Sequence, residues 1–346
     1  MNDSFVRKKR RQKQRRYFFR RLPLAALLSL IGFAVGFLAT AIALQDLTAL
    51  FSAEHLPKAL QNGGVIFAVA LVGAIVFLIL RIGSDRIRFP EDVILLFEDD
   101  VPLLATLPGI GKAGEIGDCT VPTEAMREAS RMFDVNVSYA LRDSIAGRVI
   151  GIGMPDDVPD AVLLSVRLAS ALAADGKKVA LVDCDLRTSP LAAALSCEEE
   201  LGISEYLFGK GTQINVHKQL LPDVSVILGG MPAENPIPLL RSEKCGALFA
   251  ALAARFDFVL VNLPPILPTS DAISLAGTLS GTVAAAREGR TRGEDLFESA
   301  RRILSTGSRF LGVLFEKRDP TPRDIPVESL FSEDVRDDVP EGGEEI

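Results

Sequence analysis

Short apolar runs alternate with stretches of helical periodicity over most of the second half of the chain. A run of four to six apolar residues predicts a strand buried on both faces, and apolar residues three and four apart predict a helix packed on it. The expected strands are 149–153, 179–182, 224–228, 256–261, 281–286 and 310–315. The expected helices are 160–174, 202–209, 239–254, 271–276 and 293–306. This alternation predicts an α/β fold with a doubly wound, mostly parallel sheet.

Two further helices are predicted ahead of the first strand. Residues 91–97 have a short amphipathic pattern, and residues 122–141 form a longer helix with Thr123 as its N-cap. Prolines bracket an extended piece at 102–108. We interpret residues 83–121 as a juxtamembrane linker and residues 122–318 as the α/β domain.

The first 82 residues have the pattern of a membrane hairpin. Residues 22–44 are uncharged and almost wholly apolar, and a second apolar stretch at 63–82 follows after a short linker. A bilayer is crossed by about 20 such residues, which predicts two spans. Residues 1–21 hold ten Lys and Arg, and further Arg residues follow the second stretch, so both ends are expected in the cytoplasm. The basic run also suits anionic lipids, and we predict no nucleic-acid binding because a span follows it directly.

Composition limits the remaining chemistry. The net charge of −7 includes ten Asp and Glu in the tail 319–346, which has too little apolar content for a core and is predicted to be disordered. The four cysteines show no CxxC spacing and are expected to be reduced thiols with packing roles. Only two histidines occur, far apart in sequence, which argues against histidine-based catalysis or metal binding.

The loop after the first strand of the sheet is placed where an α/β protein binds nucleotide phosphates. A phosphate-binding loop needs glycines, a Lys and a Ser or Thr, but residues 154–162 read MPDDVPDAV. Two prolines remove amide donors, and three aspartates repel phosphate. Asp183 and Asp185 follow the next strand at the same edge. They are either residual ligands of magnesium and nucleotide or a loop that caps the following turn and pairs with Arg187.

Five segments together resemble one family. They are DRIRFPEDV to ATLP at 85–108, EAMREASR at 124–131, GKKVALVDCDLR at 176–187, NPIPLLRSEK at 235–244, and a Pro-Pro to Asp run at 264–271. This combination is similar to the bacterial tyrosine kinases fused to polysaccharide co-polymerase membrane segments, which have the MinD-like, deviant-Walker P-loop fold. The resemblance implies the same fold and a place in capsular or exopolysaccharide biosynthesis.

The departures from the family's motifs concern its catalytic residues. Alignment places Asp160 where the family has a Gly, Ala161 at its catalytic Lys, Val162 at its magnesium-binding Ser or Thr, and Asn262 at its Walker B Asp. Loss of the phosphate Lys and of the acidic residue removes stabilisation of the transferring phosphoryl group. The resemblance therefore implies a degenerate member without kinase activity.

The helix at 124–131 corresponds to the family's ring-assembly helix. The resemblance implies an oligomer contact by Glu124, Arg127 and Arg131, although Ser130 stands at the second Arg position and Arg131 is one residue late. The alternative is a solvated, charged helix face.

We therefore expect a membrane-anchored, pseudokinase-like adaptor that works through protein contacts with polysaccharide assembly proteins: a kinase, polymerase, flippase or glycosyltransferase. We expect no cofactor, with residual Mg-ATP or ADP binding left open. The alternative is a divergent tyrosine kinase or MinD-like ATPase in the same pathway. A third hypothesis is a membrane organiser that dimerises through Gly32 and Gly36 of the first span.

Overall fold

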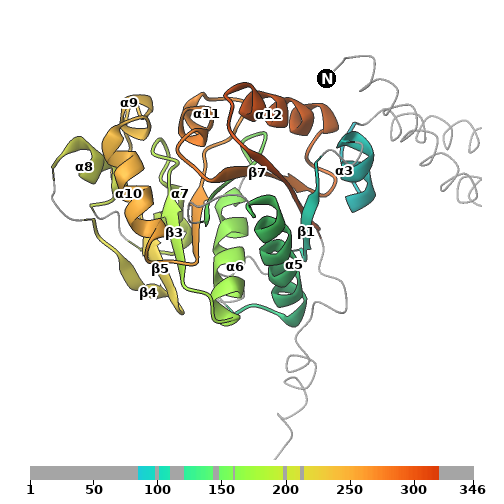
Figure 1. Cartoon of the computed structure of the whole chain (residues 1–346), viewed down its shortest axis with the longest axis horizontal. Coiled ribbons are helices and arrows are strands. Elements are labelled where there is room, and N and C mark those ends of the chain that lie inside the picture. Colours follow the sequence, from blue (N-terminus) through green and yellow to red (C-terminus); the bar gives the residue numbers. More distant parts are fainter. Residues whose placement is uncertain are drawn as a thin grey trace, which may run out of the picture. The chain divides into compact units, whose positions relative to one another are not determined.

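The computed structural model describes residues 85–97, 101–109, 121–142, 148–158, 160–197, 201–210 and 214–318. These residues contain an eight-stranded sheet in the order β1-β8-β7-β2-β6-β3-β5-β4 (Figure 1). The strands are β1 (Leu103–Leu107), β2 (Arg148–Gly153), β3 (Val179–Asp183), β4 (His217–Leu221), β5 (Val224–Ile227), β6 (Phe258–Asn262), β7 (Gly281–Arg287) and β8 (Phe310–Glu316). The helices are α3 (Pro90–Phe97), α5 (Glu124–Ala140), α6 (Ala161–Ala174), α7 (Pro190–Ala194), α8 (Ile203–Phe208), α9 (Ile237–Leu240), α10 (Glu243–Ala253), α11 (Asp271–Ala276) and α12 (Gly293–Ser305).

The sheet is parallel except at one edge, where β4 runs antiparallel to β5. From β2 the chain passes to β3 and then to the edge strand β4, returns through β5, and inserts β6 between β2 and β3. Most residues of these central strands are buried, which explains their uninterrupted apolar sequences. The predicted α/β fold with a mostly parallel sheet is thereby confirmed.

The segment expected to be a linker contributes its own strand to the sheet. β1 pairs in parallel with β8, and Ile87 hydrogen-bonds to the turn after β7 through the carbonyl of Thr291. Gly312 permits the close approach of β1, because its φ is +151° and a Cβ there would lie 2.4 Å from the carbonyl oxygen of Pro102. The described part of 83–121 therefore belongs to the sheet domain, because β1 and Ile87 are hydrogen-bonded to it.

Three other local predictions are corrected. The expected helix 239–254 is two helices, α9 and α10, because the hydroxyl of Ser242 accepts a hydrogen bond from the amide of Cys245 at 3.2 Å and starts a new helix. The sequence analysis missed β4, whose polar residues lack an apolar run, and α7, whose five residues are too few for a periodic signal. Thr123 caps α5 as predicted, accepting from the amide of Met126.

The predicted spans at 22–44 and 63–82, the basic end 1–21 and the acidic tail 319–346 lie outside the described residues. Among the residues that are described, no helix has both the length and the apolar content that crossing a bilayer requires.

Candidate functional site

The carboxyl ends of β2, β3 and β6 bring the predicted site residues to one edge of the sheet. Asp183 ends β3 and faces Asn262, which ends β6, as its direct partner in the neighbouring strand. Asn262 in turn pairs with Ile152 of β2, just before the loop 154–160. The structure therefore places these groups side by side, as the parallel sheet predicts.

Asp183 is fully buried and has three hydrogen-bond donors around its carboxylate. They are the Asn262 side-chain amide at 2.9 Å, the backbone amide of Leu191 at 2.9 Å and that of Asp185 at 3.2 Å. Burial nevertheless raises the pKa of Asp183 to about 7, because the three donors do not offset the loss of water and the nearby charge of Asp185 adds to it. A carboxyl group with this pKa is protonated in a large fraction of molecules at neutral pH.

Asp185 holds the turn that leads to α7. Its carboxylate accepts from the backbone amides of Arg187 at 3.2 Å and Thr188 at 3.3 Å, and from the Thr188 hydroxyl at 2.7 Å. Asp183, through Leu191, fixes the first turn of α7 in the same way. Both carboxylates thus have the capping role that the sequence analysis gave as one alternative.

The guanidinium of Arg187 does not bond the carboxylate of Asp183 or Asp185, so the expected pairing is wrong. That group binds Asp271 at the start of α11, with distances of 2.5 and 3.1 Å. The carboxylate of Asp271 is only 1% exposed, whereas the Arg187 side chain is 40% exposed. The pair joins the turn after β3 to the helix after β6, and sequence reasoning missed it because the partners are 84 positions apart.

The loop after β2 buries its apolar side chains and bonds to its own backbone. Met154, Val158 and Val162 are buried in the apolar core. The amide of Ala161 donates to the carbonyl of Val158 at 3.1 Å, so the first turn of α6 does not present this donor to a ligand. Asp160, at φ +60°, adopts the left-handed conformation that this tight entry requires.

The segment after β6, at Ile266 and Leu267, hydrogen-bonds to the same loop. The amide of Ile266 donates to the carbonyl of Met154 at 2.9 Å, and the amide of Leu267 donates to that of Pro155 at 3.0 Å. Gly153 permits this contact, because a Cβ there would lie 3.1 Å from Ile266. The carbonyls of Met154 and Pro155 are therefore satisfied inside the protein.

These residues do not fit the nucleotide phosphates or the magnesium ion that the family resemblance implies. Ala161, which the resemblance places at the family's catalytic Lys, is half-buried against the core, and Asp156 and Asp157 are exposed. Within the described ranges, no three acidic, histidine or cysteine side chains are grouped to hold a metal ion. Asp183 and Asp185 remain a prediction as metal ligands, with their oxygens already accepting the bonds above.

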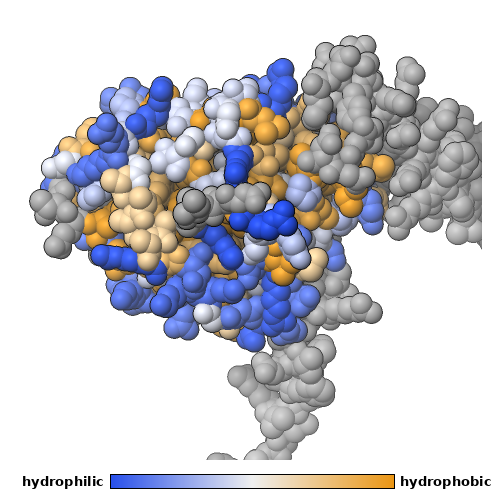
Figure 2. Space-filling model, in the orientation of Figure 1, coloured by the Kyte–Doolittle hydropathy of each residue, from blue (hydrophilic) through white to orange (hydrophobic). Residues whose placement is uncertain are grey.

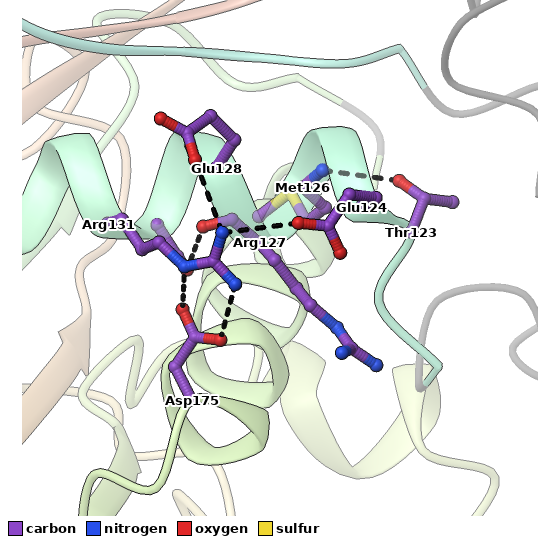
Figure 3. Close-up of polar contacts among 8 residues, drawn as sticks. Thr123, Glu124, Met126, Arg127, Glu128, Arg131 and Asp175 are labelled. Atoms are coloured by element: carbon purple, nitrogen blue, oxygen red, sulfur yellow. Dashed lines mark hydrogen bonds and ion pairs between the residues drawn. The ribbon is translucent and has the colours of Figure 1, made fainter.

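The second predicted site lies on α5, and most of its charged side chains bond other side chains of the same chain. Figure 3 shows Glu124, Glu128 and Asp175 converging on the guanidinium of Arg131. Asp175 at the end of α6 binds it through two bonds of 3.1 and 3.2 Å, and each glutamate contributes one of 3.2 Å. Arg131 therefore joins α5 to α6.

Arg127 points away from this group in Figure 3, and its buried Nε has no hydrogen-bond partner among the described residues. The resemblance groups Glu124, Arg127 and Arg131 as one oligomer contact. In the structure, Glu124 and Arg131 bond each other, and Arg127 points elsewhere. The oligomer contact stays a prediction.

The chain matches bacterial tyrosine kinases in sequence and in fold, although no family model matches it. It is 27% identical over 194 residues to the tyrosine-protein kinase wzc of Salmonella typhi, which covers 56% of this chain and 27% of that protein. It is also 27% identical over 155 residues to the tyrosine-protein kinase CpsD of Streptococcus agalactiae, covering 44% of this chain and 68% of CpsD. The chain thus spans about a quarter of the length of several curated relatives it matches.

Comparison of structures leads to the same group. The BceF tyrosine kinase domain superposes with a TM-score of 0.56 at 25% identity, covering 67% of this chain and 99% of that domain. The kinase domain of the Escherichia coli tyrosine kinase ETK has a TM-score of 0.57 at 23% identity, covering 65% of this chain and 93% of that domain. The described domain is therefore a homologue of bacterial tyrosine kinase domains, as the sequence motifs predicted.

Proposed function

We propose that this chain is a membrane-anchored, pseudokinase-like adaptor or regulator of capsular or exopolysaccharide biosynthesis and export. It acts through contacts with polysaccharide assembly proteins and transfers no phosphoryl group. The closed loop after β2 is the observation that carries the proposal. Where a kinase of this fold needs a Lys and inward-facing amides, this chain has Ala161, a buried Val158 and an amide that is already bonded.

Nucleotide binding would compete with the contacts that close the loop after β2. A nucleotide would have to open the loop, expose Met154 and Val158, and break the bonds from Ile266 and Leu267 before any phosphate contact formed. Each buried apolar side chain contributes about 2 kcal/mol, and each lost bond about 1 kcal/mol. That total is comparable to the binding free energy of a millimolar to micromolar ligand, so nucleotide affinity is expected to be very weak.

The resemblance to co-polymerase kinases supports the pathway, and the apolar stretches 22–44 and 63–82 support the anchor. In this proposal the chain crosses the bacterial cytoplasmic membrane twice. Both termini and the α/β domain are cytoplasmic, and the basic end lies against anionic lipids. Reporter fusions at residues 1, 55 and 346 test it: a periplasmic signal is expected at 55 alone, and any other pattern contradicts the hairpin.

The alternative is a divergent nucleotide-dependent tyrosine kinase or MinD-like ATPase. The retained fold and the carboxylates of Asp183 and Asp185 favour it. Calorimetric titration of the full chain in detergent with ATP or ADP and magnesium separates the two proposals. We expect no binding at millimolar nucleotide. Micromolar binding that Asp183→Ala abolishes, together with phosphotransfer to a tyrosine substrate, would establish the alternative.

A further inference from the structure

We draw no further inference here: the strongest candidate, the exposed apolar patch of Met132, Val135 and Tyr139 on α5, lies on the face where Figure 2 shows hydrophobic residues among hydrophilic ones, and nothing in the described part of the chain shows what covers it.

Discussion

Replacing Asp183 by Asn tests whether burial controls the protonation of the candidate site. The folded protein raises the pKa of this carboxyl from 3.8 to about 7. A raised acid pKa means that the folded state binds the proton more tightly than the unfolded state. The resulting stability is fully present below pH 3.8 and is lost as the pH rises toward 7. The amide of the Asp183→Asn variant does not titrate in this range, so the variant lacks this loss of stability.

The size of the change in unfolding free energy follows from the raised pKa of Asp183. About three pKa units correspond to about 4 kcal/mol between pH 4 and pH 8, an upper value because a buried site relaxes when it ionises. Unfolding in urea, followed by circular dichroism, measures the free energy of each protein across this range. The unchanged chain should lose stability relative to Asp183→Asn by about 1 to 4 kcal/mol as the pH rises, a range set by that relaxation.

The result that refutes this reasoning is a stability difference that does not change with pH. It would mean that the bonds from Asn262, Leu191 and Asp185 stabilise the carboxylate enough to cancel the effect of burial. A carbon-13 titration of the Asp183 carboxyl gives an independent reading, with a midpoint near 7 expected and a midpoint near 4 contradicting the prediction.

Three further predictions concern the same edge and the sheet behind it. Arg187→Ala leaves the buried carboxylate of Asp271 unpaired and should lower the free energy of unfolding by about 3 kcal/mol, whereas the double change with Asp271→Asn should cost less than the two single changes together. Asn262→Asp replaces an amide donor to Asp183 with a second carboxyl and should destabilise the protein more at pH 8 than at pH 5, as urea unfolding measures. Gly312→Ala places a Cβ against the backbone before β1 and should cost about 2 kcal/mol by thermal unfolding.

One of these changes has a direct control. Gly246→Ala adds a Cβ with its nearest neighbour 3.7 Å away inside α10, so it should leave stability unchanged or raise it slightly. A destabilisation equal to that of Gly312→Ala would contradict the steric argument. Likewise, equal effects of Asn262→Asp at both pH values would show that the second carboxyl does not interact with Asp183.

The sequence predicted the central sheet and the residues at its edge because both depend on local pattern. The strands around Asp183 and Asn262 are uninterrupted apolar runs, and parallel strands must bring their carboxyl ends together. The prediction that the loop after β2 lacks phosphate chemistry also rests on local residue types. The structure adds that Met154 and Val158 of this loop are buried in the core, which residue type alone does not establish.

The ion pairs that the sequence does not predict depend on distant partners. Arg187 was assigned to the nearer aspartates, whereas Asp271, far along the chain, binds it because the sheet brings α11 over the turn after β3. Asp175 is a similar case: its position after α6 indicates a helix end, and nothing local shows that it binds Arg131 of α5. Long-range ion pairs of this kind follow from topology, which only the assembled sheet defines.

The placement of β1 has the most direct experimental consequence. Residues 83–121 are predicted from sequence to be a linker, and a fragment starting near residue 120 would then be complete. Because β1 pairs with β8, that fragment exposes the edge of β8, including the backbone groups that bond Pro102 and Leu107. A fragment of residues 85–318 should therefore stay soluble and resist proteolysis, whereas 121–318 should aggregate or unfold at lower urea. Equal stability of the two fragments, measured side by side by urea unfolding and light scattering, would mean that β1 adds nothing to the sheet.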